Sequence, residues 1–438
     1  MNYYEILYEK INCKEAIIGV IGLGYVGLPL ALTFAEKEFS VFGFDIDSEK
    51  VKLLNQGISY LSHIPASRLK VVLNKQKFKA TNDFSLLSEV DVIIICVPTP
   101  LTPKREPDLR FIKETIKTIK QYLKPGQLVS LESTTYPGTT EELLLPLFTS
   151  KGLEAGKEFF LIFSPEREDP GNPHFSTQNI PRIVGGITPK CSKLGHTLYS
   201  SIINQVKVVS SPRVAEMAKL LENIYRSINI ALVNELKILA QRMGIDIWEV
   251  IEAASTKPFG FTPFYPGPGM GGHCIPVDPF YLSWKAKEYD FTVKFIELAG
   301  EINISMPYYV VERIGEALNQ IEKSVKGSNI LILGMTYKKD IGDMRESPAL
   351  PIIKILQSKG AIVHYNDPFI PKIPPLRSYK FDLSSVPLTA EVLQKMDVVV
   401  IVTDHSSYDY KWIVKHSQLV VDTRNATSGI EDKKIIKA

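Results

Sequence analysis

The chain has 438 residues, which is enough for two or three domains. With 45% hydrophobic and 23% charged residues, its composition is typical of a soluble globular enzyme. The formal net charge of +3 is too small to indicate nucleic acid as a general partner.

The four cysteines stand far apart, and no Cys-x-x-Cys pair occurs. This spacing argues against a disulfide framework or a metal site and favours a reducing cytoplasm. Residues 17–35 carry no charge and reach the length of a transmembrane helix, but their regularly spaced glycines favour a globular segment. Charged side chains interrupt the first sixteen residues, so we expect neither a signal peptide nor a membrane segment.

Short apolar runs alternate with helical stretches in the first half of the chain. Residues 16–21 predict a buried strand, and the glycine-rich turn that follows leads into a helix ending near residue 37. Further strands are predicted at residues 41–45, 91–97, 127–131, 159–163 and 182–184. This alternation predicts a doubly wound parallel sheet, and residues 1–208 are expected to form a Rossmann-like domain that binds NAD.

The middle of the chain has little strand character. Apolar residues recur at helical spacing over residues 213–243, which predicts one long helix, and a second is expected over residues 295–322. We therefore interpret residues 209–322 as a helical central domain and as the interface of a homodimer or higher homo-oligomer.

The strand and helix pattern restarts near the end of this helical region. Strands are predicted at residues 329–333, 361–365, 397–402 and 419–421, with a helix at 347–358. Residues 323–438 should therefore form a second Rossmann-like domain. The expected fold class is α/β, with two doubly wound parallel-sheet domains joined by long helices.

The first motif that carries chemistry is Gly22-x-Gly24-x-x-Gly27. Its first glycine permits a tight turn, its second lets backbone amides meet a pyrophosphate, and its third lets helix and strand pack closely. Asp45 ends the next predicted strand, where a carboxylate would accept both ribose hydroxyls. NAD is favoured over NADP because no arginine lies nearby. A plain tight turn is the alternative.

The second motif contains Cys274, which four glycines within residues 267–272 precede. A thiol beside a cavity built from glycines is a candidate nucleophile, although a lone cysteine is often a small buried hydrophobe. Asp278 could position a water molecule or cap a helix. Lys219 and Asn223 share one helix face, where they could stabilise an oxyanion or form a solvated surface.

Polar side chains also follow several predicted strands. Glu132 to Thr135 and Ser164 to Arg167 could bind a ligand at the carboxyl ends of the strands, or cap helices. Lys338 and Arg345 could meet phosphate charge, and solvated surface charge is the alternative.

Four motifs occur in an order that resembles the UDP-glucose/GDP-mannose 6-dehydrogenase family, over nearly the whole chain. They are Gly22-x-Gly-x-x-Gly27, Glu216-x-x-Lys219-x-x-x-Asn223-x-x-Arg226, Gly271-Gly-x-Cys274-x-x-x-Asp278 and Lys338-Lys-Asp-x-x-Asp-x-Arg345. Residues 257–276 and 295–303 look most like the UDP-N-acetylglucosamine 6-dehydrogenase branch.

The resemblance implies that a sugar C6 alcohol is oxidised to a carboxylate with two NAD. Cys274 then matches the nucleophile that forms a thiohemiacetal and a thioester, and Lys219 and Asn223 match the groups that stabilise the oxygen. The remaining catalytic matches are Asp278 and Thr134, which orient water, and Glu166, which assists hydrolysis. Matches to NAD contacts are Gly22, Gly24, Tyr25, Val26, Gly27, Asp45, Thr99, Thr134 and Arg345. Matches to substrate contacts are Lys219, Asn223, Phe264, Tyr265, Gly271, Lys338 and Arg424.

The sequence departs from the family pattern upstream of Cys274. UDP-glucose enzymes of the family carry an arginine there that reaches the substrate of the neighbouring subunit, whereas Lys257 is the only basic residue in this stretch. The expected substrate is therefore a UDP-N-acetylhexosamine, with UDP-N-acetylglucosamine favoured over UDP-N-acetylmannosamine and UDP-glucose.

Two other functional classes remain open at this stage. A two-electron β-hydroxyacid dehydrogenase would also use a lysine and an asparagine one helical turn apart, but it needs no thiol and no third domain. A sensor that binds NAD or a nucleotide sugar without catalysis is the second alternative, and reduction of NAD with UDP-sugars would distinguish it.

Overall fold

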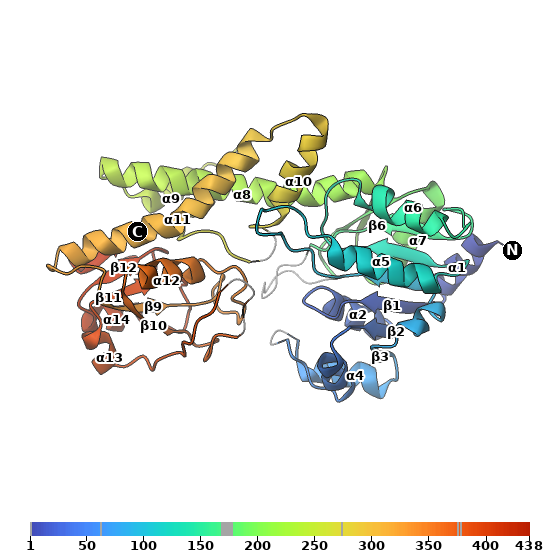
Figure 1. Ribbon diagram of the computed structural model, residues 1–438, viewed down its shortest axis with the longest axis horizontal. Coiled ribbons are helices and arrows are strands. Elements are labelled where there is room, and N and C mark those ends of the chain that lie inside the picture. Colours follow the sequence, from blue (N-terminus) through green and yellow to red (C-terminus); the bar gives the residue numbers. More distant parts are fainter. Residues whose placement is uncertain (1, 62–63, 168–177, 273–274, 375, 377–378) are drawn as a thin grey trace. The chain divides into compact units, whose positions relative to one another are not determined.

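The computed structural model describes residues 2–61, 64–167, 178–272, 275–374, 376 and 379–438 (Figure 1). These residues form two compact units, which are described separately below. The first unit is Met1–Glu222 with Phe280–Thr292, and the second is Asn223–Pro279 with Val293–Ala438. The expected division into three domains remains a prediction.

The first unit contains an eight-stranded sheet in the order β3-β2-β1-β4-β5-β6-β7-β8. All neighbouring strands run parallel except β6 and β7, which are antiparallel. The strands are β1 Ile17–Ile21, β2 Ser40–Phe44, β3 Phe78–Thr81, β4 Val92–Ile95, β5 Leu128–Leu131, β6 Phe160–Phe163, β7 Arg182–Gly186 and β8 Val206–Val209. The helices are α1 Tyr3–Asn12, α2 Gly27–Glu36, α3 Ser48–Asn55, α4 Ala66–Asn74, α5 Arg110–Tyr122, α6 Leu145–Thr149 and α7 Pro189–Ser200, with short turns η1 Phe84–Ser88 and η2 Thr140–Leu144.

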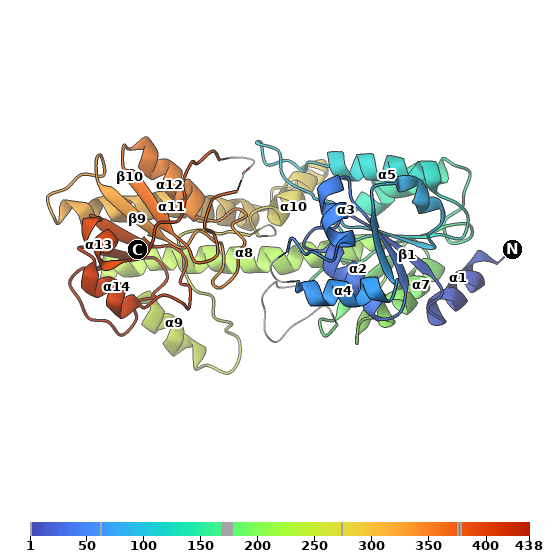
Figure 2. The same ribbon diagram turned by 90° about the horizontal axis from the view of Figure 1, so that it is seen from below.

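Helices cover both faces of this sheet (Figure 2). Ile94 of β4 packs into the core that α1, α2 and α7 share, whereas its neighbours Ile93 and Ile95 pack into the core formed with α5 and α6. Because both faces of β4 are buried, its sequence is an unbroken apolar run, as expected for a strand of a parallel sheet. The carboxyl ends of β1, β2, β4 and β5 lie at one edge, which places the segments after them together.

The long helix α8, Pro212–Met243, passes from the first unit into the second, and α10, Asp278–Ala286, also contributes to both. The turn η3, Lys287–Tyr289, follows α10 in the first unit. In the second unit, α9 spans Ile247–Ser255 and α11 spans Lys294–Asn319. The predicted long helices over residues 213–243 and 295–322 therefore correspond to α8 and α11.

The second unit contains a five-stranded parallel sheet in the order β10-β9-β11-β12-β13. Helices α11 and α12 pack on one face of it, and α13 and α14 pack on the other (Figure 1). The strands are β9 Asn329–Leu333, β10 Ile362–Asn366, β11 Val398–Ile401, β12 Val420–Asp422 and β13 Ile435–Lys437. The helices are α12 Ala349–Ser358, α13 Ala390–Lys395 and α14 Tyr410–His416.

The predicted fold class is confirmed, because two mostly parallel α/β sheets occur together with long helices. The sequence did not predict β3, β8 and β13, which are short strands at or near the edges of the sheets. Over the described part of the chain, no helix combines the length and the hydropathy needed to cross a bilayer.

Candidate functional site

The turn between β1 and α2 shows a separate reason for each glycine of the motif. Gly22 has a φ of +91°, and a Cβ there would lie 2.6 Å from the carbonyl oxygen of Cys96. A Cβ on Gly27 would lie 1.9 Å from the oxygen of Gly22, so helix and turn are in direct contact. A Cβ on Gly24 would have no atom within 4 Å. The backbone at Gly24 is thus open to a ligand, which fits the pyrophosphate of a dinucleotide.

Asp45 follows β2 and is buried beside this turn. Its Oδ2 accepts a hydrogen bond from the amide of Leu23 at 2.9 Å, and its Oδ1 accepts one from the amide of Asp47 at 3.0 Å. The hydroxyl of Tyr60 donates to the carbonyl oxygen of Leu23. Burial, together with the charges of Asp45 and Asp47, raises the pKa of Tyr60, so this hydroxyl stays protonated. The carboxylate is fixed where a ribose bound by the turn would meet it.

The other residues matched to NAD contacts in the first unit lie at the same strand ends. Tyr25 and Val26 are partly buried in the glycine turn. Thr99 is buried after β4, and its carbonyl oxygen accepts a hydrogen bond of 2.7 Å from the hydroxyl of Tyr281 on α10. The contact ties α10 to the edge of the sheet where the strand ends gather.

A buried ion pair lies under the segments that follow β5 and β6. Glu132 accepts hydrogen bonds from the guanidinium of Arg182 and from the hydroxyl of Tyr199. Arg182 also donates to the hydroxyl of Ser164 at 2.9 Å and lies 4.5 Å from the ring centroid of Tyr199. Burial raises the pKa of Glu132, and the nearby charge of Glu166 adds to the shift, against the opposing effect of Arg182. Glu132 is thus neither a helix cap nor exposed to a ligand.

Two neighbouring threonines follow β5, shortly after Glu132, and differ in exposure. Thr134 is partly buried, as is Glu166 after β6. Thr135 is 1% exposed, and its hydroxyl oxygen has no hydrogen-bond partner. The charge of Glu166 acts on both Glu132 and Arg182, which places its carboxylate close to the buried pair. Thr134 and Glu166 thus share the strand-end edge of the sheet.

Polar residues of α8 are buried, which excludes the solvated helix face that the sequence left open. Lys219 is 6% exposed and Asn223 is 2% exposed. Glu216, one turn before Lys219, accepts hydrogen bonds from the amide of Gly138 at 2.5 Å and the amide of Thr140 at 3.0 Å. Its role is therefore to anchor the start of η2, and burial raises its pKa.

Asn223 and Asp278 are 55 residues apart in the sequence but form a buried hydrogen bond. The side-chain amide of Asn223 donates to Oδ2 of Asp278 at 2.6 Å, and Asp278 is 1% exposed. Asp278 also opens α10. The guanidinium of Arg226 lies 3.5 Å from Oδ1 of Asn223. The amide and the carboxylate that the sequence assigned to separate motifs thus lie together.

Cys274 and its neighbour His273 lie outside the described residues. The glycines before them contact the loop that follows β9. A Cβ on Gly271 would lie 2.6 Å from Cβ of Tyr337, and the amide of Gly272 donates to the carbonyl oxygen of Arg345 at 3.0 Å. Gly272 has a φ of +84°. These glycines are needed because the segment leading to Cys274 runs directly against the second sheet's loop.

The aromatic residues matched to substrate contacts lie on the same segment, farther from Cys274. Phe264 packs edge-on against Tyr225 of α8, with ring centroids 5.6 Å apart. Tyr265 is half exposed and stacks on Trp248 of α9, also at 5.6 Å. Both rings hold residues 264–265 against the central helices.

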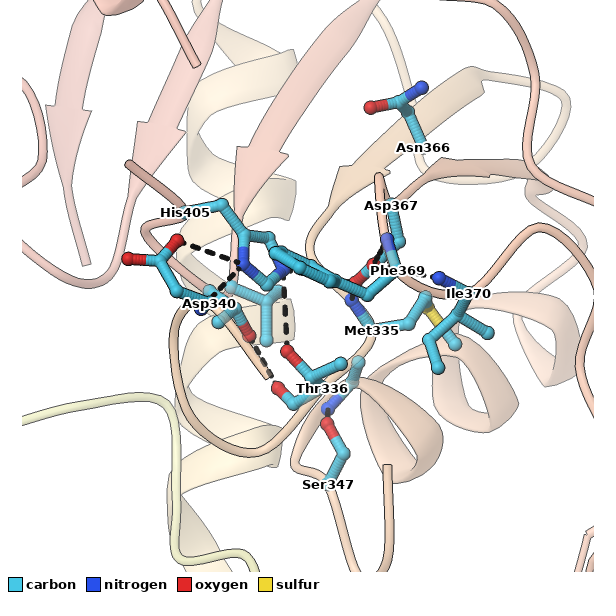
Figure 3. Close-up of polar contacts among 12 residues, drawn as sticks. Met335, Thr336, Asp340, Ser347, Asn366, Asp367, Phe369, Ile370 and His405 are labelled. Carbon is cyan, nitrogen blue, oxygen red and sulfur yellow. Dashed lines mark hydrogen bonds and ion pairs between the residues drawn. The ribbon is translucent and has the colours of Figure 1, made fainter. Parts of the chain in front are cut away.

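The loop that carries Lys338 is fastened by His405 (Figure 3). Nδ1 of His405 accepts a hydrogen bond from the amide of Asp340 at 3.0 Å, so the ring proton sits on Nε2. Nε2 lies 3.1 Å from Oδ2 of Asp367 and 3.3 Å from the hydroxyl of Thr336. His405 is fully buried. It therefore joins both ends of the turn 336–340 to the strand end at Asp367.

Two arginines of the second unit already have partners within the chain. Arg345 pairs with Asp343 at 2.6 Å. Nε of Arg424 donates to the carbonyl oxygen of Val402 at 3.0 Å, and a Cβ on Gly267 would lie 2.6 Å from one of its terminal nitrogens. Arg424 therefore lies against the backbone of the segment that leads to Cys274.

Sequence reasoning missed Arg182, Tyr199 and His405. Arg182 begins a predicted strand and His405 follows one, and neither position has a motif that marks a buried polar contact. Only the packing of distant segments reveals them, as for Asp340 and His405, which are 65 positions apart. In the described part of the chain, no group of three or more His, Cys, Asp or Glu is arranged to hold a metal ion.

Family models match three successive parts of the chain. Residues 16–203 match the NAD binding domain of the UDP-glucose/GDP-mannose dehydrogenase family, 213–305 match its central domain, and 331–429 match its UDP binding domain.

Individual relatives match over most of their length. The chain is 36% identical to a UDP-N-acetyl-D-mannosamine dehydrogenase of Pyrococcus horikoshii, over 93% of this chain and 95% of the relative. It is 38% identical to a UDP-N-acetyl-D-glucosamine 6-dehydrogenase of Pseudomonas aeruginosa, over 82% and 84%. A solved structure of UDP-D-ManNAc dehydrogenase from Pyrococcus horikoshii superposes with a TM-score of 0.86 at 34% identity, covering 96% of this chain and 98% of that one. The chain therefore belongs to the UDP-glucose/GDP-mannose dehydrogenase family and is an NAD-dependent oxidoreductase that acts on a UDP-sugar.

Proposed function

We propose that this protein oxidises the C6 alcohol of a UDP-N-acetylhexosamine, UDP-N-acetylglucosamine in the first place, to the uronic acid. The observation that carries the proposal is the buried hydrogen bond of 2.6 Å between Asn223 and Asp278. An amide that can stabilise a developing oxyanion thereby lies beside a carboxylate that can orient water. Lys219 lies one turn before Asn223 on α8 and is also buried.

The residues of the chain divide the reaction into steps. Lys219 and Asn223 stabilise the oxygen as the alcohol loses its proton; NAD, when bound in the first unit, would supply the acceptor for the hydride that leaves C6 in each of the two oxidations. The thiolate of Cys274 then adds to the aldehyde carbon to give a thiohemiacetal, whose oxidation leaves a thioester. Water oriented by Asp278 and Thr134 attacks the thioester, Glu166 assists, and the thiol is released. One alcohol, one water and two NAD give one carboxylate, two NADH and three protons.

The preference for an N-acetylated sugar rests on residues 257–276 and on the missing arginine. Lys257 lies over the ring of Phe259 at 5.1 Å, and both side chains are exposed. This basic residue is therefore accessible, on a surface that a second subunit can cover. The relatives named above include enzymes for the gluco and manno isomers, so the configuration at C2 has to be decided by assay.

The assay is a kcat/KM comparison among UDP-glucose and the N-acetylated gluco, manno and galacto sugars, with an aldehyde trap present. We expect the highest value for UDP-N-acetylglucosamine, two NADH per sugar and no trapped aldehyde. A higher kcat/KM for UDP-glucose than for every N-acetylated sugar would contradict the proposed substrate. One NADH per sugar would contradict the thioester and favour a two-electron dehydrogenase.

We further propose that the protein works as a homodimer or a higher homo-oligomer through its central helices. Large apolar side chains are exposed along α8, α9 and α11, and a buried position is favourable for them. Those on α8 and α11 include Leu221, Leu232, Leu236, Leu239, Phe295, Leu298 and Tyr308. Light scattering of the purified protein should give at least twice the mass of one chain. We also propose that the protein is located in the cytoplasm, which the wide spacing of its cysteines favours.

A further inference from the structure

Lys237 on α8 carries a buried amine for which the structure provides no hydrogen-bond acceptor. Its side chain is 6% exposed, and its Nζ has no hydrogen-bond partner in the structure. The ring of Tyr309 on α11 lies beside it, with its centroid 5.5 Å from Nζ. A buried ammonium without an acceptor is unfavourable, and a protein usually keeps such a group only where something neutralises it.

A second cation, Arg424, lies close enough to Lys237 to act on its charge. Gly267 links the two regions of the chain, because its amide donates to Oδ1 of Asn234 at 2.9 Å. A terminal nitrogen of Arg424 lies against the same glycine, 2.6 Å from where its Cβ would be. Asn234 and Lys237 are three residues apart on α8 and so share a helix face. Arg424 therefore borders the segment 264–272 that leads to Cys274, and Lys237 lies on the helix face that holds this segment through Asn234.

The nearby carboxylate does not neutralise these cations. The charge of Asp422 acts on both, but its oxygens already accept from Lys437, from Thr427 and from the amides of Arg424 and Ala426. Arg313, the third cation near Lys237, pairs with Glu316. In the described part of the chain, neither Lys237 nor Arg424 forms an ion pair with a carboxylate. The charges of Asp422 and Asp404 act on these two groups without an ion pair, so the positive charge is only partly offset.

We propose that Lys237 and Arg424 together bind the diphosphate of the UDP-sugar. The proposal rests on the proposed function, since that function supplies a substrate with two phosphates. The part of the chain that matches the UDP binding domain, residues 331–429, contains Arg424, which follows β12 at the carboxyl edge of the second sheet. Lys237 adds a donor to it from the central helix, which no motif in the sequence marks.

Binding of an anion at Lys237 should be coupled to its protonation. The groups that face Lys237 are Arg424 and Asp422 from the end of β12, and Arg313 and Tyr309 from α11. Burial, and then the charge of Arg424, lower the pKa of Lys237 to about 7. At pH 8 the free amine is therefore mostly neutral, and a phosphate placed beside it favours the charged form. UDP binding should draw one proton from the buffer.

The native protein tests this coupling without any substitution. UDP binding is measured by titration calorimetry at pH 8 in buffers that differ in ionisation enthalpy. We expect an uptake approaching one proton per UDP, and no uptake when uridine, which carries no phosphate, is titrated instead. Equal uptake for UDP and uridine, or none for UDP, would overturn the proposal.

The substitution Lys237→Met keeps the length of the side chain and removes the amine. The Kd for UDP and the KM for the UDP-sugar should rise by about 10- to 100-fold, as for the loss of a hydrogen bond to a charged group. The Kd for uridine and for NAD should stay within about twofold of the native values on the same reasoning. Proton uptake should disappear in this variant.

Lys354→Met is the matched control. Lys354 also lies over a tyrosine ring, that of Tyr379 at 5.7 Å, but it is exposed. Its substitution should leave UDP binding unchanged. Unchanged UDP affinity in Lys237→Met would show that Lys237 only packs on Tyr309. The proposed function would still stand in that case if the native protein oxidises the UDP-sugar. UDP binding with proton uptake but without sugar oxidation would instead retain the subsite and reject the proposed function.

Discussion

The first turns of the two sheets are built alike and differ in one feature. Gly22 after β1 has a φ of +91° and donates from its amide to the carbonyl oxygen of Phe44 at 2.8 Å. Gly334 after β9 has a φ of +87° and donates to the carbonyl oxygen of Asn366 at 3.0 Å. The same backbone geometry thus opens both loops.

The carboxylates after the neighbouring strands also correspond. Asp45 accepts from the amide of Leu23, and Asp367 accepts from the amide of Met335 at 2.6 Å. Each acid also accepts from the amide two residues after itself. In the second sheet, however, the acid has two further contacts, one from the amide of Ile370 and one from the ring of His405 (Figure 3). Asp367 is therefore enclosed, whereas the backbone near Asp45 is open at Gly24.

An acidic residue after the second strand therefore serves the fold before it serves a ligand. In both sheets it locks the glycine turn, so Asp45 alone did not establish a dinucleotide site. The open space at Gly24 is what makes the first turn fit a pyrophosphate. The second turn has Thr336 at the position that corresponds to Gly24, and the hydroxyl of Thr336 contacts His405.

The largest effect is expected for Gly27→Ala, because its Cβ would lie 1.9 Å from the oxygen of Gly22. The free energy of unfolding should fall by about 3 kcal/mol or more, and NAD binding should be lost. Gly24→Ala is the matched variant, since its Cβ meets nothing in the chain. Its free energy of unfolding should lie within about 0.5 kcal/mol of the native value, although its affinity for NAD should fall at least about 10-fold. Denaturant unfolding and fluorescence titration with NADH measure both.

If Gly24→Ala bound NADH as well as the native protein does, the pyrophosphate would not approach this turn. In the second sheet, Gly334→Ala should weaken the binding of UDP but not the binding of NADH. Gly334 begins the turn that carries Lys338, and a Cβ there would lie 2.4 Å from Cβ of Thr403.

Much of the fold could be predicted because its signals are local. The apolar runs of β1, β4, β9 and β11 and the helical periodicity of α8 lie within single segments. β3, β8 and β13 were missed, because short strands near an edge gain their stability from neighbours that are distant in the sequence. The antiparallel pairing of β6 with β7 was missed for the same reason.

The candidate site was predictable only where a motif fixes the spacing of its residues. Asn223 and Asp278 were both chosen, but their contact depends on how α10 packs against α8. Burial decided other cases. Glu132 was expected at a ligand or a helix cap and instead pairs with Arg182, which no local pattern indicates.

The next largest effect is expected for Asp45, in comparison with Asp367. Asp45→Asn removes the charge that is expected to accept the ribose hydroxyls, so the KM for NAD should rise by about 10- to 100-fold. Discrimination against NADP should also weaken, because a negative charge near the 2′-phosphate is removed. Asp367→Asn should leave the KM for NAD unchanged, since His405 encloses that carboxylate. Steady-state kinetics with both dinucleotides tests the pair, and equal effects of the two substitutions would show that the sheets do not differ as described.

The dependence of the protein's stability on acid pH should distinguish Asp367 from exposed carboxylates. Burial raises the pKa of Asp367, but its hydrogen bonds with His405, Met335 and Phe369 outweigh burial and hold it below the usual value of 3.8. A carboxyl with a lowered pKa contributes stability above pH 3.8, and this contribution is lost as the pH falls through the pKa of the folded state. Asp367→Asn should therefore destabilise the protein at pH 7, and the difference from the native protein should shrink below pH 3.8. Unfolding followed by circular dichroism across this range, with the exposed Asp382→Asn as the control, measures it.

The smallest effect is expected for a hydroxyl that the first sheet leaves without a partner. Thr135 lies after β5 and Thr423 after β12, the strand at the corresponding place in the second sheet, and both are 1% exposed. The hydroxyl of Thr423 donates to the carbonyl oxygen of Ile401 at 2.7 Å, whereas the hydroxyl oxygen of Thr135 has no partner. Removing a buried hydroxyl that makes no hydrogen bond also removes the free-energy cost of burying it. The free energy of unfolding of Thr135→Val should therefore lie between the native value and about 1 kcal/mol above it. Thr423→Val loses a bond and should cost about 1 kcal/mol. A loss of stability in Thr135→Val as large as that in Thr423→Val would mean that a buried water satisfies this hydroxyl and that the two sheets are alike here as well.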